Sequence, residues 1–159
     1  MDAVFKKLNY KGQQQVFALN APDSFEVNIA SIADEATIKT KVGKADKITF
    51  AIGFATQQSQ VDNIVNTVVP KLEGDAVFWI CYPKGTSKKY KCDFNRDTGW
   101  AIMGQYDFEP VRMVAIDEDW SALRFRKVGF IKTMTRNEKM VLSEAGKQKA
   151  ATKAHKSSK

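Results

Sequence analysis

The apolar positions of this chain change between two spacings, which predicts strands alternating with helices. Between residues 47 and 54, large apolar side chains alternate with small or polar ones: Ile48, Phe50, Ile52 and Phe54 point one way, Thr49, Ala51 and Gly53 the other. A period of two is typical of a strand, and small residues on its second side indicate cover on both faces. The continuous apolar run from Ala76 to Tyr82, AVFWICY, predicts a second strand of this buried kind.

A helix is predicted between these two strands. Its apolar residues recur at intervals of three and four, at Val61, Ile64, Val65, Val68, Val69 and Leu72. That spacing forms one apolar stripe on a helix of 3.6 residues per turn. Thr56 or Ser59 is expected to cap its start, and Pro70 and Gly74 mark its end.

The remaining pattern predicts shorter elements on either side. They are a strand at 16–19, a short strand at 38–42, a helix at about 95–105, an antiparallel hairpin of 109–116 and 120–128, and a terminal helix at about 135–145. The segment 25–36 fits both a strand and a helix, and the helix is favoured because Asp23 or Ser24 can cap it. This order predicts an α/β fold: a single three-layer Rossmann-like domain, residues 1–131, whose mostly parallel sheet is closed by the antiparallel C-terminal hairpin.

The positive charge is concentrated at the carboxyl end. The chain of 159 residues has a net charge of +7; residues 132–159 hold seven lysines and one arginine against two glutamates, whereas residues 1–131 hold 17 basic and 16 acidic side chains. Residues 132–145 are assigned to the terminal helix, and 146–159, which lack bulky apolar residues, are expected to be disordered. This tail is interpreted either as solvated or as a weak, non-specific contact to nucleic acid through Lys147, Lys149, Lys153, Lys156 and Lys159.

The two cysteines and the apolar runs indicate the compartment. Cys81 and Cys92 form no C-x-x-C pair, and the ligands of a zinc site are missing. The first residues lack the apolar core of a signal peptide, and no apolar run reaches 18 residues. We therefore expect a cytoplasmic protein without metal or membrane contact.

Several kinds of catalysis are disfavoured. The single histidine is His155, in the tail, and no G-x-S-x-G sequence occurs. A dinucleotide or S-adenosylmethionine site would call for a glycine-rich turn after the first strand, but Leu19–Asp23 has no glycine and Pro22 lacks an N–H donor. The acidic run 117–119 is interpreted as turn chemistry rather than a metal site. No cofactor is predicted, and a non-enzymatic role is favoured.

The lysine-rich segment 83–91, PKGTSKKYK, is the one positive sign of a ligand site. It leaves the carboxyl end of a buried strand, where parallel sheets bind ligands. We predict an anion site formed by Lys84, Thr86 and Ser87 together with residues that follow other strands: Asn20, Asp23 and Thr56. The alternative is a solvated surface loop. Tyr90 is a candidate stacking ring for nucleic acid, whereas Trp79, Trp100 and Trp120 are expected to be core residues.

Four segments of the chain resemble a bacterial domain-of-unknown-function family. They are LNAP at 19–22, WICYPK at 79–84, DFNRDTGW at 93–100 and VRMVAIDEDWSALRFR at 111–126. The family's members are small single-domain cytosolic proteins with a degenerate methyltransferase-like sheet and no assigned activity. The resemblance covers most of residues 5–128 and implies the same fold, but no catalytic residues.

Three hypotheses about function follow. The first is a non-catalytic binding or interaction module with an anion-binding loop at the carboxyl edge of the sheet. The second is a divergent, methyltransferase-like transferase acting on a phosphorylated or nucleotide ligand. The third is a nucleic-acid accessory protein that uses the basic tail. The missing glycine turn favours the first hypothesis over the second, and the position of the charge favours it over the third.

Overall fold

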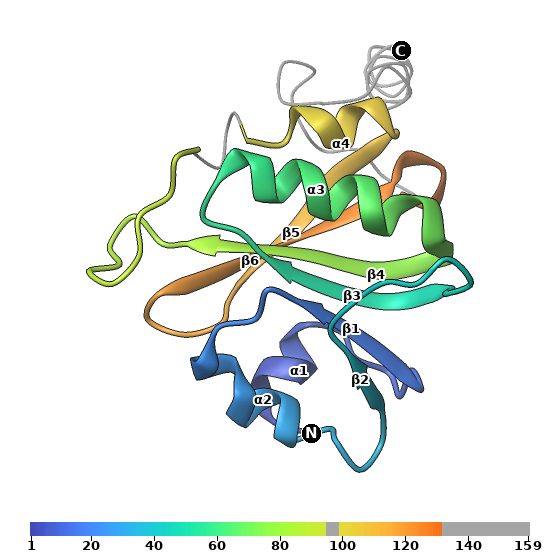
Figure 1. Cartoon of the computed structure of the whole chain (residues 1–159), viewed down its shortest axis with the longest axis horizontal. Coiled ribbons are helices and arrows are strands. Elements are labelled where there is room, and N and C mark those ends of the chain that lie inside the picture. Colours follow the sequence, from blue (N-terminus) through green and yellow to red (C-terminus); the bar gives the residue numbers. More distant parts are fainter. Residues whose placement is uncertain (95–98, 132–159) are drawn as a thin grey trace, which may run out of the picture.

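A mixed sheet of six strands runs through the middle of the molecule, between two layers of helices (Figure 1). This computed structural model describes residues 1–94 and 99–131. The strands are β1 (Gln15–Leu19), β2 (Thr37–Lys39), β3 (Ile48–Phe54), β4 (Leu72–Pro83), β5 (Phe108–Ala115) and β6 (Trp120–Lys127). The helices are α1 (Ala3–Lys7), α2 (Glu26–Ala30), α3 (Gln58–Val68) and α4 (Ala101–Gln105), with 3₁₀ turns at Asp23–Phe25, Val69–Lys71 and Val128–Phe130.

The strand order is β2-β1-β3-β4-β6-β5. β2, β1, β3 and β4 run parallel to one another, while β6 is antiparallel to both β4 and β5. The prediction of a mostly parallel α/β sheet that ends in an antiparallel hairpin is therefore confirmed.

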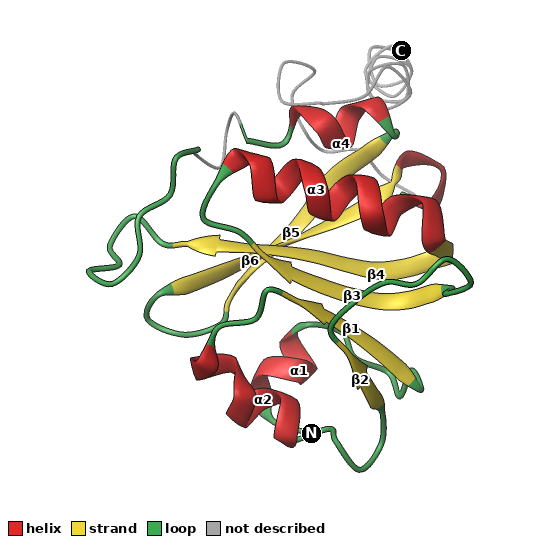
Figure 2. Ribbon diagram, in the orientation of Figure 1, coloured by secondary structure: helices red, strands yellow, loops and turns green. Residues whose placement is uncertain are grey.

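Both faces of the central strands β3 and β4 are largely buried, as their patterns predicted, whereas most of the edge strand β5 after Pro110 is exposed. Helices α3 and α4 cover one face, and α1 and α2 cover the other (Figure 2). Trp120 and Phe125 of β6 belong to different core clusters, on opposite faces. Trp79, Trp100 and Trp120 are all buried, at 0%, 2% and 3% exposure, which confirms their interpretation as core residues.

One side chain of β3 lies on the unexpected face. Phe50, Ile52 and Phe54 pack with α1 and α2, but Ile48 belongs to the cluster beneath α3. The pairing of β3 with β4 shifts its register between Ile48 and Phe50. This irregularity breaks the alternation, so the prediction that Ile48 shares a face with Phe50 is wrong.

The helix boundaries also differ from the predictions. The capping residue of α3 is Gln57, which forms a capping box with Gln60, and not Thr56 or Ser59. Helix α2 ends at Ala30, and turns occupy most of the stretch to Ala36. Helix α4 begins at Ala101. The predicted terminal helix and the basic tail lie outside the described residues.

Helix α1 is an element that the sequence pattern did not predict. Asp2 caps it, because its Oδ1 accepts a 3.0 Å hydrogen bond from the Phe5 N–H. Phe5 and Leu8 are fully buried, and the Trp79 indole donates a 2.9 Å hydrogen bond to the Leu8 carbonyl. Five residues are too few for a stable isolated helix, so this contact with the sheet holds it in place.

Candidate binding site

The lysine-rich loop is fixed at both ends of its first turn. Where β4 ends, the Lys84 N–H donates a 2.8 Å hydrogen bond to the Asp119 carbonyl, and the Ser87 N–H donates one of 3.0 Å to the Lys84 carbonyl. The loop therefore leaves the sheet beside the β5–β6 turn. In that turn, Asp117 Oδ1 accepts hydrogen bonds from the N–H groups of Asp119 and Trp120, which matches the interpretation of the acidic run as turn chemistry.

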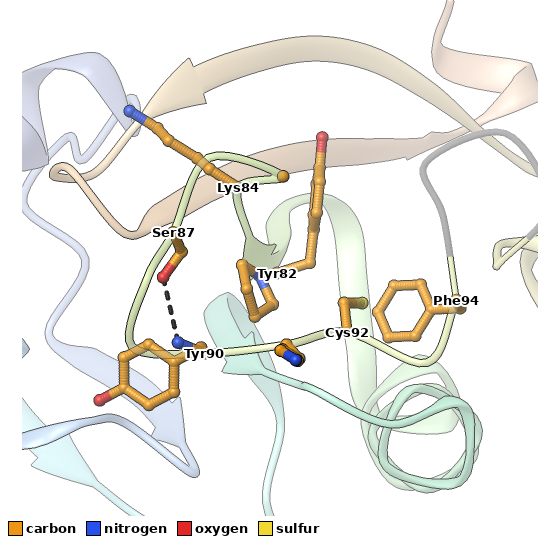
Figure 3. A pocket seen from close by; sticks show the side chains of 9 residues that line it. Tyr82, Lys84, Ser87, Tyr90, Cys92 and Phe94 are labelled. Atoms are coloured by element: carbon orange, nitrogen blue, oxygen red, sulfur yellow. Dashed lines mark hydrogen bonds between the residues drawn. The ribbon is translucent and has the colours of Figure 1, made fainter.

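Ser87 holds the loop together. Its hydroxyl donates to Asp119 Oδ1 at 2.8 Å and accepts from the Tyr90 N–H at 3.1 Å. Figure 3 shows the second of these bonds. Because the hydroxyl proton is directed to a carboxylate, Ser87 shapes the loop rather than offering that proton to an anion.

A cavity of about 500 Å³ lies under this loop, at the carboxyl end of β4. In Figure 3, Lys84 extends away from Cys92 and Phe94, which lie next to each other. Lys84 thus lies on one side of the cavity, and Cys92 and Phe94 form an apolar side opposite it. Its lining combines three aromatic rings, two lysines and a thiol with small residues of the loop: Tyr82, Pro83, Lys84, Gly85, Ser87, Tyr90, Lys91, Cys92 and Phe94. We refer to it as the β4 cavity.

A second hollow, of about 480 Å³, is lined by other residues of the same loop. Thr86, Lys88 and Lys89 line it together with Glu118 and Asp119. Its two lysines face two carboxylates, so its charges offset one another. In the described part of the chain, the lining of the β4 cavity includes no carboxylate. Excess positive charge is therefore greater in the β4 cavity.

The predicted site residues are divided among several places. Lys84 and Ser87 line the β4 cavity, and Thr86 lines the second hollow. Asn20, Asp23 and Thr56 line neither of them.

Thr56 has local partners instead. Its N–H and hydroxyl both donate to Gln60 Oε1, and its carbonyl accepts a 3.1 Å hydrogen bond from the Asp93 N–H. The tail lysines lie outside the described residues, so their role in nucleic-acid binding stays a prediction.

Asn20 lies in the sharp turn after β1, at a position where glycine is usually found. It has φ +58°, in the left-handed region that asparagine tolerates better than most residues. The chain then continues through Pro22 into the first 3₁₀ turn, which buries Phe25. The turn after β1 is thus built without glycine, and an aromatic side chain follows it directly.

Aromatic rings fill the carboxyl edge of the sheet on the α1–α2 face. Ring centroids are 5.0 Å apart for Phe25 and Phe54, 5.2 Å for Phe54 and Trp120, and 4.9 Å for Trp120 and Tyr90. The Tyr90 ring packs against Trp120, which differs from its interpretation as a stacking ring for nucleic acid. This row of rings closes the side of the sheet edge where β1 and β3 end.

Sequence reasoning missed Tyr82, Cys92 and Phe94 as lining residues. Tyr82 was part of an apolar strand, and Cys92 and Phe94 follow the loop in a segment without clear periodicity. One feature of the sequence did point to them. The polar loop 83–91 has aromatic residues on both sides, and the chain returns after it to the carboxyl end of β4.

The two thiols differ in exposure. Burial raises the pKa of Cys92, although a hydrogen bond from the Phe94 backbone opposes this, and the nearby Asp93 charge raises it further. Burial raises the pKa of the fully enclosed Cys81 well above its usual range. Both thiols are therefore protonated at neutral pH, and neither is a ready nucleophile.

The described residues offer no cluster of histidine, cysteine or carboxylate side chains that could hold a metal ion. Within the same residues, no helix has the length and apolar character needed to span a bilayer.

Comparison with known proteins shows a distant likeness of fold. No family model matches the chain, and no curated protein matches it. Among solved structures, a protein of the NADB-Rossmann superfamily from Streptococcus agalactiae is 12% identical with a TM-score of 0.46, and covers 98% of this chain and 84% of its own. The tRNA methyltransferase TrmK from B. subtilis is 10% identical with a TM-score of 0.48, and the coverages are 98% and 83%. The N-methyltransferase NodS from Bradyrhizobium japonicum is 11% identical with a TM-score of 0.46, over 72% and 85%. This likeness concerns the path of the backbone and says nothing of activity.

Proposed function

We propose that this protein is a binding module that holds a small anionic ligand with an apolar or aromatic body in the β4 cavity. The supporting observation is the composition of that cavity, which joins Lys84 and Lys91 to the rings of Tyr82 and Phe94. Ligand cavities are typically apolar with a few polar groups that set orientation, and their volumes fall in the range of about 300–1,000 Å³.

The division of the cavity into two sides favours a ligand of mixed character. The lysines attract and neutralise an anion such as a phosphate or carboxylate. On the apolar side, Cys92 and Phe94 are half-buried, and Phe94 packs edge-on against Trp100 with ring centroids 5.3 Å apart. Such a surface stabilises an apolar group by removing it from water.

The same residues favour binding over transfer chemistry. Among the described lining residues there is no carboxylate or imidazole to act as a base, and the Cys92 thiol is protonated at neutral pH. We therefore favour the binding module over the transferase.

Thiol protection tests this proposal, because Cys92 lines the cavity while Cys81 is fully enclosed. Nucleotides and phosphorylated metabolites are first screened for compounds that raise the melting temperature. A compound that binds in the β4 cavity slows alkylation of Cys92 in the native protein, and the double variant K84A/K91A loses both effects.

Lys88→Ala is the matched control, since it removes a lysine from the same loop but from the second hollow. It should retain stabilisation and protection. The proposal fails if no anionic compound protects Cys92, or if K84A/K91A is protected as well as the wild type.

A further inference from the structure

Two arginines lie directly opposite each other on the antiparallel hairpin. Arg112 of β5 pairs with Arg124 of β6, so both side chains project from the same face. The Cβ atoms of such cross-strand neighbours are about 4.5–5.5 Å apart, and like charges in this arrangement destabilise a sheet. Arg112 is exposed and Arg124 is half-buried.

The carboxylate of Asp75 binds a different arginine of the same strand. Arg126 binds Asp75 through two N–H groups and also donates to the Phe130 carbonyl at 2.9 Å. Glu109, which is fully buried, is the cross-strand neighbour of Arg126. Over residues 1–94 and 99–131, no hydrogen bond or ion pair reaches the guanidinium of Arg112 or Arg124.

One N–H group of Arg124 lacks a hydrogen-bond acceptor. Its Nε is buried and lacks a hydrogen-bond partner in the described structure. Burial lowers the pKa of its guanidinium, the charges of Arg126 and Arg112 lower it further, and Asp75 opposes them. The group nevertheless stays protonated, because an arginine side chain does not lose its proton in proteins. A buried donor without an acceptor destabilises the fold.

We propose that Arg112 and Arg124 together bind a phosphate group, and that a phosphomonoester is preferred. A guanidinium matches the geometry of an oxyanion with two parallel N–H donors, and two such groups match an anion with two charges and three terminal oxygens. A carboxylate or a phosphodiester has a single charge and is satisfied by one arginine.

Lys7 increases the positive potential on this side of the sheet. Helix α1 covers the face from which the two arginines project, and Lys7 Nζ donates a 2.6 Å hydrogen bond to the Ala115 carbonyl at the end of β5. Lys7 therefore attracts the anion without being required for its geometry.

Calorimetric titrations at matched ionic strength test this site with inorganic phosphate, phenyl phosphate and a single-stranded oligonucleotide. We expect inorganic phosphate and phenyl phosphate to bind. Arg112→Gln or Arg124→Gln should weaken the binding of both compounds at least tenfold. Lys127→Gln is the control, because it removes an equal charge from the opposite face of β6, and it should leave binding unchanged.

Melting temperatures separate this role from a purely structural one. Without phosphate, R112Q should be at least as stable as the wild type because a like-charge pair is removed. With phosphate, the wild type should become the more stable of the two. Since Arg112 is exposed, this variant reports on the site even if R124Q fails to fold.

The proposal is wrong if phosphate does not bind, if R112Q binds it as tightly as the wild type, or if only the oligonucleotide binds. Cys92 protection distinguishes the two sites. Phosphate that protects Cys92 and is unaffected by R112Q occupies the β4 cavity, whereas phosphate at the arginine pair leaves alkylation of Cys92 unchanged.

Discussion

Asp93 accepts a 2.6 Å hydrogen bond on Oδ1 from the backbone N–H of Gln58, the first residue of α3. The Asp93 N–H in turn donates to the Thr56 carbonyl. The segment that leaves the β4 cavity is thereby attached to the start of the helix that follows β3. The carboxylate also meets the positive end of the helix dipole.

Removing this carboxylate should weaken the helix and the cavity together. We expect Asp93→Ala to lower stability by about 1 kcal/mol, which is the usual loss for a side-chain cap. That corresponds to a fall in melting temperature of about 2–4 °C for a chain of this size. Asp93→Asn, which keeps an acceptor oxygen, should recover most of the loss in a thermal melt. Equal stability of D93A and the wild type would show that the bond contributes nothing.

Gly53 is required where α3 approaches β3 most closely. A Cβ at this position would lie 2.9 Å from both Cδ1 and Cγ2 of Ile64. Gly53→Ala therefore overpacks the interface and should destabilise the protein by about 1–3 kcal/mol, measured by urea unfolding.

Ile64→Ala provides the test of this explanation. In the double variant G53A/I64A the clash is absent. Its loss of stability should therefore be smaller than the sum of the losses in the two single variants. Strict additivity would show that the loss has another cause.

Trp120 should be a structural residue. It is 3% exposed and packs between Phe54 and Tyr90, with ring centroids at 5.2 and 4.9 Å. Trp120→Ala should lower the free energy of unfolding by about 3–5 kcal/mol.

Trp120→Phe is the control for this substitution. It keeps a ring in place and removes the indole Nε1, which has no hydrogen-bond partner in the described structure. It should therefore be clearly less damaging in the same unfolding experiment. A folded and equally stable W120A would identify Trp120 as a contact residue.

These contacts show which parts of the fold the sequence can predict. β3, β4, the β5–β6 hairpin and α3 follow from hydrophobic periodicity, since each buries a continuous face. Helix α1 and the position of Ile48 do not, because a tertiary contact of Leu8 and a register shift determine them.

The sequence predicts where the candidate site lies but not which residues line it. A polar loop after a buried strand locates the β4 cavity near Lys84. Asn20 and Thr56 follow other strands of the same edge, but rings at Phe25 and Phe54 occupy the space on the α1–α2 face, and the return of the chain brings Cys92 and Phe94 instead. The sequence holds no periodic signal for either effect.

Alkylation of Cys92 should depend on pH in the direction set by its burial. Because burial raises the pKa of this thiol, the reactive thiolate is scarcer at pH 8 than in an exposed cysteine, whose pKa is about 8.5. Reaction with iodoacetamide should be slow at pH 8 and still accelerate as the pH rises above 9. Cys92→Ser should leave the native protein unlabelled, since Cys81 is enclosed. A rate that levels off by pH 7.5 would contradict the raised pKa.

S-adenosylmethionine should not bind, and calorimetry at millimolar ligand is the measurement. After β1, Asn20 makes the turn, Pro22 offers no N–H, and the buried Phe25 follows at once. Phe25 also contacts Phe54, at 5.0 Å between ring centroids, at the carboxyl end of β3. A cofactor placed there would have to displace this aromatic pair from the core, at a loss of several kcal/mol. Binding with micromolar affinity would contradict this prediction, show that the pair moves, and favour the transferase over the binding module.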